Sequence, residues 1–305
     1  MGNDTQAKSR AGVWGAFAAD ALCLGVHWEY NAAALRQKHG RVSDYKAPDP
    51  DSYHKGKKAG DFTHYGDQAL VLLNSLARNG KFDLNAFSRQ WRDLFADYAG
   101  YRDMASKKTL AGFQQGLGPL SAGSASDDLA GSSRIAPLLA AYAQDLDGLL
   151  EAAREQTQMT HNNPLVLDSA QFFARSAHAA LHGASPLEAM ESAAKEGEYD
   201  SPLLEQGYWA GLESAGQDTT RTIGDFGSSC HAPSALPGVV HLIAGYPDNL
   251  EKALVENAMA GGDSSARGML AGLVLGASLG MEAIPARWLE GLSARADIEA
   301  GLAAL

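Results

Sequence analysis

The sequence predicts an all-α protein that folds as a single compact domain over residues 1–305. Three observations support this prediction. Apolar residues recur at intervals of three and four in most long segments, and stretches that alternate apolar and β-branched residues with polar ones are nearly absent. Pro186, Pro202 and Pro233 each open an apolar-periodic stretch, where the first turn of a helix tolerates proline because its missing N–H would have no partner.

The helical pattern continues along most of the chain, and no linker rich in Ser, Pro, Gly or like charges divides it. In chain order, we expect helices over residues 14–24, 69–76, 87–98, 138–142, 169–181, 186–194, 202–212, 233–243, 250–259 and 266–279. The segment 31–63 holds two prolines among charged residues and glycines, so we expect an irregular surface loop there.

The last predicted helix carries glycines at four-residue intervals, at positions 268, 272, 276 and 280. This spacing puts them on one face, where another backbone can approach closely. A glycine inside a helix costs roughly 0.5–1 kcal/mol relative to alanine. A tight contact must offset that cost, and we therefore expect this helix to lie at the centre of the fold.

The overall charge excludes some classes of partner. The formal net charge is -11, which opposes nonspecific attraction to nucleic acid and to anionic membranes. No apolar stretch reaches the roughly 17–25 residues of a membrane-spanning helix. The two cysteines, Cys23 and Cys230, lie in unrelated surroundings and encode neither a disulfide framework nor a cysteine zinc site. We therefore expect a cytoplasmic protein.

Short polar segments stand at the ends of predicted helices: Asp20, residues 64–67, Thr160 with His161, and residues 263–265. Asp67 and Asp263 each precede a predicted helix, where a carboxylate can accept backbone N–H groups as an N-cap. Together they also make a pair of hard oxygen ligands. With the hydroxyls of Ser264 and Ser265, this is a set that magnesium or calcium accepts.

Five motifs in one order resemble the ADP-ribosylglycohydrolase family. That family has a GDALG-type turn after its first helix, a TDDT stretch that opens a helix, an MRIAPL stretch, a TH pair, and GGDTDT before a glycine-rich helix. This chain has AADALCLG, HYGDQALVLL, SSRIAPLL, MTH and GGDSSARG. The variants THYGDQ, VHWEY and GGDSSARG are more similar to the J-crystallin and selenoprotein J branch than to the arginine-specific hydrolases.

The resemblance implies a compact orthogonal helical domain that binds ADP-ribose between helices, with two magnesium ions held by TDDT and DTDT. Aligned on Gln68, residues 64–67 occupy the TDDT positions, while Ser265 and Ala266 replace the second aspartate and the last threonine of GGDTDT. Because magnesium often rests on one or two carboxylates and keeps several waters, we expect Asp67 and Asp263 to hold one Mg²⁺ rather than two. A metal-free site is the alternative.

We consider two alternative roles for each of three residues near this expected metal site. His64 has an ordinary pKa suited to proton transfer near neutrality, but a hydrogen-bonded histidine at a helix entrance is the alternative. Tyr65 would stack on a ring of the substrate or simply pack. Arg267 would pair with Asp67 in place of a metal ion or bind a substrate phosphate.

The remaining candidates follow from the matched motifs. Asp20 corresponds to the GDALG aspartate and is expected to support the site. Thr160 and His161 would line the ribose-phosphate pocket, or cap a helix. Ser132 would line the same pocket, and Arg134 would meet a phosphate through its planar donors, or form an ion pair in the core.

From these expectations we predict a hydrolase that cleaves a glycosidic bond between ADP-ribose, or a related ribosyl nucleotide, and a protein or small molecule. Asp67 would orient water or hold the metal, and His64 would assist proton transfer. Two alternatives stay open. One is a noncatalytic protein that binds ADP-ribose or serves a crystallin-like structural role, and the other is a metal-independent hydrolase that uses His64 and Asp67.

Overall fold

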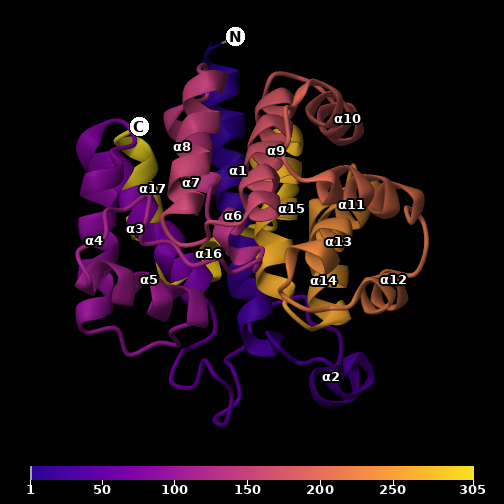
Figure 1. Cartoon of the computed structure of the whole chain (residues 1–305). Helices are drawn as coiled ribbons and strands as arrows, with labels where there is room; N and C mark the ends of the chain where they lie inside the picture. The colour runs from indigo at the N-terminus through magenta and orange to yellow at the C-terminus, as the bar shows by residue number, and fades with distance from the viewer. Residues whose placement is uncertain (1) are drawn as a thin grey trace.

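Two long helices, α1 (Gly2–Cys23) and α15 (Ser264–Leu279), lie side by side at the centre of the structure (Figure 1). The structure is a computed structural model that describes residues 2–305. Every α15 residue from Ser264 to Ala277 is buried. The prediction of an all-α fold is confirmed, since the described residues contain helices, turns and two isolated β-bridges but no extended strand.

The glycine spacing has the expected cause over most of its length. A methyl group on Gly272 would stand 2.4 Å from the carbonyl oxygen of Gly15, and one on Gly276 would stand 2.5 Å from that of Ala11. Gly280 does not belong to this contact. It ends α15 with φ +80°, and a methyl group there would meet nothing within 4 Å. Its role is helix termination, because residues other than glycine rarely adopt that φ.

The other helices surround this central pair. Figure 1 shows α3, α4, α5 and α17 on one side and α10 to α14 on the other, while α7, α8 and α9 lie between them. In chain order these helices are α2 (Ala32–His39), α3 (His64–Asn79), α4 (Leu84–Ala96), α5 (Met104–Gln114), α6 (Ala130–Ser133), α7 (Ala136–Ala141), α8 (Leu146–Gln158), α9 (Pro164–Leu181), α10 (Pro186–Glu196), α11 (Pro202–Glu213), α12 (Thr219–Phe226), α13 (Ala232–Gly245), α14 (Leu250–Ala260), α16 (Ala286–Gly291) and α17 (Arg295–Ala303).

Each predicted helix is present, usually with longer bounds, and Pro186 and Pro202 begin α10 and α11 as expected. The expectation of an irregular segment 31–63 is wrong in part, because α2 lies within it. Asn31 caps α2 by accepting from the N–H groups of Ala33 and Ala34. Only Leu35 of this helix is buried, so it has no apolar periodicity to reveal it.

The start of α3 also differs from the expectation. The helix begins at His64, and the Thr63 hydroxyl caps it by accepting from the N–H of Tyr65. Asp67 therefore lies in the first turn of α3 instead of at its N-cap. Asp263 does cap α15, with a carboxylate oxygen 3.4 Å from the N–H of Ala266. The N-cap of α3 is therefore Thr63, and His64 is the first residue inside the helix.

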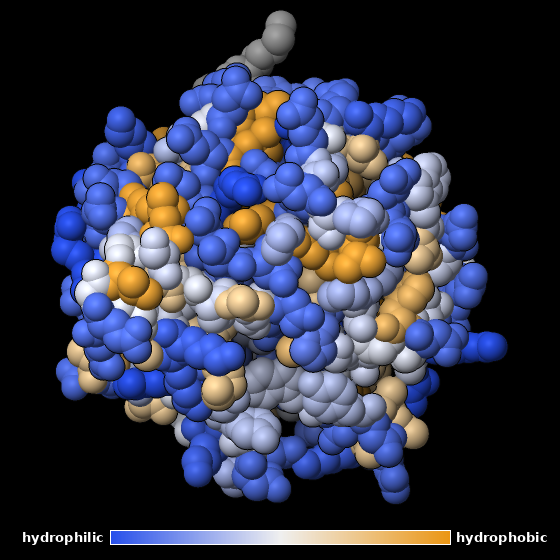
Figure 2. Space-filling view, in the orientation of Figure 1, coloured by the Kyte–Doolittle hydropathy of each residue, from blue (hydrophilic) through white to orange (hydrophobic). Residues whose placement is uncertain are grey.

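The molecular surface is mainly hydrophilic on the face shown in Figure 2, where apolar side chains form separate small patches. Over residues 2–305, no helix combines the length and apolar character that crossing a membrane requires.

Candidate functional site

Asp20 joins three helices at one point. Its carboxylate accepts hydrogen bonds from the Thr63 N–H at 2.8 Å, from the Thr63 hydroxyl at 2.6 Å and from the Ser265 hydroxyl. The end of α1 is thereby tied to the starts of α3 and α15. Burial raises the pKa of Asp20 to about 6, although these hydrogen bonds lower it. Ser265, expected as a metal ligand, has its hydroxyl directed to Asp20 and Thr63.

Two carboxylates meet beside the start of α15, and we call Asp128 and Asp263 the acidic pair. Their oxygens and the Cys230 sulfur all lie within 4.8 Å of one another. Burial and the charge of Asp263 raise the pKa of Asp128 well above its ordinary value, while the Cys230 thiol donates to the Asp128 carboxylate. Burial also raises the pKa of Asp263, although Arg267 lowers it. The acidic pair is therefore electrostatically expensive to hold ionised without a compensating charge.

Main-chain hydrogen bonds hold the acidic pair in place. The N–H of Asp263 donates to the Ser228 carbonyl at 2.9 Å, and the N–H of Leu129 donates to the Cys230 carbonyl at 2.8 Å. The segment 228–230 thus connects the chain around Asp128 to the start of α15. Gly262 is required at this junction, because it has φ +64° and a methyl group there would stand 2.0 Å from the Ser228 carbonyl oxygen.

Trp28 and Tyr65 orient one oxygen of Asp263. The Trp28 indole N–H donates to Oδ2 at 3.2 Å and the Tyr65 hydroxyl donates to the same atom at 3.0 Å. Trp28 is the one described residue other than glycine with positive φ, at 67°. Such a backbone costs an L-residue roughly 1–2 kcal/mol, and here it directs the indole toward Asp263.

The Trp28 ring also belongs to an aromatic cluster with Tyr53 and Tyr101. The three ring centroids lie 5.0–5.3 Å apart in edge-on pairs, which is a favourable arrangement for aromatic rings. Tyr53 is 66% exposed. The acidic pair is therefore bordered by an aromatic surface that reaches solvent.

His64 lies behind this cluster and is fully buried. Its Nδ1 is 3.2 Å from Nε2 of His54, and its Nε2 is 3.3 Å from a carboxylate oxygen of Asp103. The ring centroids of His64 and Trp28 are 5.5 Å apart. His64 is thus placed to support the aromatic cluster, and its polar partners do not include Asp67.

Asp67 has different neighbours from those we expected. Its carboxylate accepts from the Lys57 ammonium group and the Tyr98 hydroxyl, and it lines a surface hollow with Val71 and Leu94. The carboxylate that meets Asp263 is Asp128. We therefore revise the expected pair of Asp67 and Asp263 to the acidic pair of Asp128 and Asp263.

Arg134 and Thr160 belong to a buried polar network. The Arg134 guanidinium donates to the side-chain oxygens of Gln68 and Thr160, and the Thr160 hydroxyl is 2.9 Å from Nδ1 of His161. Burial and the Arg134 charge lower the pKa of His161 to about 3, and Nε2 of His161 has no hydrogen-bond partner among the described residues. The N-cap of α9 is Asn163, so neither Thr160 nor His161 caps the start of that helix.

Ser132 and Arg267 also bond to the protein itself. The Ser132 hydroxyl donates to the Leu129 carbonyl at 2.9 Å. Arg267 donates to the Asn257 side-chain oxygen at 3.2 Å and to the Gly261 carbonyl at 2.5 Å, rather than to Asp67. Ser264 has a buried hydroxyl with no hydrogen-bond partner in the described part of the chain. The hydrogen bond from Arg267 to Gly261 thus stabilises the turn that precedes α15.

The acidic pair fits one hard divalent cation. Two carboxylates with bound water are a usual magnesium set, and within the described residues no Lys or Arg lies within 4.0 Å of either carboxylate to neutralise it. Cys230 fits magnesium poorly because a thiol is a soft ligand. Its pKa is raised by burial and by Asp128, which keeps it a neutral hydrogen-bond donor.

Sequence reasoning missed Asp128, Trp28 and Cys230 as members of the site. Asp128 lies four residues before the SSRIAPLL segment and next to Asp127, and two adjacent aspartates before a short helix were a visible signal. The role of Cys230 had no such signal, because it depends on main-chain contacts between residues about 100 positions apart in the sequence.

The fold and site define an all-helical domain in which acidic residues converge where its central helices begin or end. The family model for ADP-ribosylglycohydrolase matches residues 1–305, and the chain belongs to that family. It is similar to crystallin J1A of Tripedalia cystophora, with 27% identity over 93% of this chain and 92% of the relative. Crystallin J1B of the same organism is 24% identical, over 92% of this chain and 91% of the relative.

Two further similarities extend over the whole domain. A protein of Archaeoglobus fulgidus described as "Uncharacterized protein" is 27% identical over 96% of this chain and 93% of its own length. A solved structure titled "ADP-ribosylglycohydrolase-related protein complex" superimposes with a TM-score of 0.81 and 25% identity. It covers 99% of this chain and 98% of the other. The predicted family and its fold are confirmed, together with the similarity to J-crystallins.

Proposed function

We propose that the protein hydrolyses a glycosidic bond of an ADP-ribose conjugate, either an ADP-ribosylated protein or a small ADP-ribosyl molecule, at the acidic pair. The observation that carries this proposal is the meeting of Asp128 and Asp263, which main-chain bonds hold together from distant parts of the chain. Membership of the ADP-ribosylglycohydrolase family over all 305 residues supports it.

Hydrolysis of a glycosidic bond builds positive charge at the anomeric carbon, so a carboxylate beside that carbon lowers the barrier. Asp263 suits this task because Trp28 and Tyr65 both donate to one of its oxygens. Among the described residues, its other oxygen accepts one hydrogen bond, from the Ala266 N–H at 3.4 Å. That oxygen is free to accept from an attacking water.

Asp128 and Asp263 would hold a magnesium ion, which supplies positive charge to orient ribose hydroxyls and water. The aromatic cluster offers ring faces to a planar base, in the role that we expected of Tyr65. Tyr65 itself orients Asp263. Asp20 supports the arrangement from behind by joining the starts of α3 and α15.

We assign positioning roles to the buried residues that we expected to contact substrate. Arg134, Thr160 and His161 bond mainly to one another and would shape the pocket wall. Arg267 would hold the Gly261–Gly262 turn that places Asp263. His64 would keep the Trp28 ring in position instead of transferring a proton.

Incubation with peptides ADP-ribosylated on arginine or serine, and with small ribosyl conjugates, tests the proposal when each is assayed with and without magnesium. Release of ADP-ribose that Asp263→Asn abolishes is the expected result. Folded protein that turns over none of these substrates would contradict it.

A noncatalytic role is the second candidate, and the similarity to crystallins J1A and J1B favours it. Calorimetry with ADP-ribose separates the possibilities. A binding protein gives heat without turnover, and a purely structural protein gives neither.

A further inference from the structure

A cavity separate from the acidic pair is lined by α10, α11 and the connection between them. It has a volume of about 420 Å³, within the range of roughly 300–1,000 Å³ typical of small-molecule sites. Its walls come from α10, from α11 and from the connection 197–201. None of the residues that build the acidic pair or the aromatic cluster lines this α10/α11 cavity.

The apolar part of the α10/α11 cavity is aromatic. Tyr199, Tyr208 and Trp209 line it, and Trp209 is 50% exposed although Tyr208 beneath it is buried. The centroids of these last two rings are 5.1 Å apart. The indole face of tryptophan is the strongest aromatic partner for a cation.

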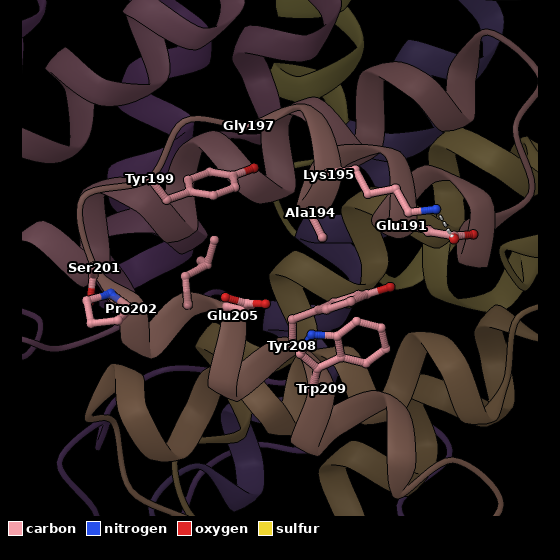
Figure 3. A pocket seen from close by; sticks show the side chains of 11 residues that line it. Glu191, Ala194, Lys195, Gly197, Tyr199, Ser201, Pro202, Glu205, Tyr208 and Trp209 are labelled. Carbon is pink, nitrogen blue, oxygen red and sulfur yellow. Dashed lines mark hydrogen bonds and ion pairs between the residues drawn. The ribbon is translucent and has the colours of Figure 1, made fainter.

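The polar part of the cavity is acidic. Glu191 is paired with Lys195, but Glu205 is exposed and has no hydrogen-bond or ion-pair partner in the described residues. Figure 3 shows the Glu205 carboxylate directed into the space between Tyr199 and Tyr208. Residues 186–209 contain six carboxylates and one lysine, so the local potential favours a cation.

From this combination we propose that the α10/α11 cavity binds a small organic cation that carries an aromatic ring, such as an arylalkylamine. The ammonium group would lie between Glu205 and the Trp209 face, and the ring would pack on Tyr199 and Tyr208. Both interactions favour the same ligand, because a carboxylate and an aromatic face each attract positive charge.

Phenethylamine is a suitable probe, because it absorbs little where tryptophan is excited. Titration of the full chain, followed by calorimetry and by tryptophan fluorescence, is expected to show saturable binding. Phenylacetate carries the same ring with the opposite charge, and ethylammonium carries the charge without the ring. Both are expected to bind at least tenfold more weakly.

Two variants locate the site. Glu205→Gln is expected to weaken phenethylamine binding about tenfold, and Trp209→Ala is expected to abolish the fluorescence change. Glu282→Gln removes an exposed carboxylate elsewhere and is expected to change nothing. Since all three residues are exposed, circular dichroism should show intact folding. The proposal is overturned if phenethylamine does not bind, if phenylacetate binds equally well, or if Glu205→Gln has the same affinity as wild type.

Discussion

Replacing Asp20 with asparagine should change how the stability of this protein depends on pH. An asparagine side chain can preserve the local contacts. Its oxygen can accept from the Thr63 N–H, while its amide group donates to the hydroxyl oxygens of Thr63 and Ser265 that now donate to Asp20. The substitution therefore removes the titration of one buried group and leaves the junction of α1, α3 and α15 bonded.

The size of the change in stability with pH follows from the pKa of Asp20, which burial raises from its ordinary 3.8 to about 6. One pKa unit corresponds to 1.36 kcal/mol, so the rise is worth about 3 kcal/mol. The folded protein binds this proton more tightly than the unfolded chain does. The stabilising contribution is thus fully present below about pH 4 and is lost as the pH rises through 6.

Urea unfolding of wild type and Asp20→Asn at a series of pH values between about 4 and 7.5 measures this effect. The free energy of unfolding of wild type, minus that of the variant, should fall by about 2.4 kcal/mol across the series, because at pH 4 the carboxyl is already partly ionised in the unfolded chain. Other titrating groups are common to both proteins and cancel in the difference. A difference that stays constant over this range, or rises with pH, would show that the folded protein does not hold the Asp20 proton more tightly than the unfolded chain does.

Three further predictions concern packing, orientation and metal binding. Gly272→Ala should destabilise the protein by about 1–3 kcal/mol in urea unfolding, because its methyl group would meet the Gly15 carbonyl at 2.4 Å. Gly118→Ala is the control, because its methyl group would have nothing within 4 Å. Its free energy of unfolding should stay within about 0.5 kcal/mol of wild type. An equal effect of the two would show that the α1 and α15 contact can relax. Trp28→Phe keeps an aromatic ring but loses the 3.2 Å bond to Asp263, so turnover should fall at least tenfold with intact folding, and unchanged turnover would remove Trp28 from the site. Magnesium at about 100 times its dissociation constant should stabilise wild type by about 2.7 kcal/mol in thermal unfolding and stabilise Asp128→Asn far less; equal stabilisation of both would place the ion elsewhere.

The sequence was informative about the fold because most of its helices have one apolar face against the core. Helix α4, for example, buries Phe87, Trp91 and Phe95 at four-residue spacing. Helix α2 has a single buried leucine and therefore left no periodic signal. Its start was marked only by Asn31, a cap whose side chain also suits turns.

The site was predicted less completely, because motifs mark positions in the chain but not directions of side chains. Asp263 caps α15 as its position before a predicted helix indicated, and Asp20 lies near the end of α1, where it accepts from the Thr63 N–H. Asp67 and Tyr65 lie on the same turn of α3 but point in different directions. The Tyr65 hydroxyl bonds to Asp263, whereas the Asp67 carboxylate bonds to Lys57 and Tyr98. The convergence of Asp128 with Asp263 depends on long-range main-chain bonds that no local pattern encodes.

The most direct test of the central claim compares Asp128→Asn with Asp67→Asn in one assay of ADP-ribose release from an ADP-ribosylated peptide. Both substitutions replace an aspartate with its amide of nearly the same shape, but only Asp128 belongs to the acidic pair. We expect Asp128→Asn to lower kcat at least a hundredfold and Asp67→Asn to change it less than tenfold. A large loss with Asp67→Asn and near-normal turnover with Asp128→Asn would show that the acidic pair is not the catalytic site.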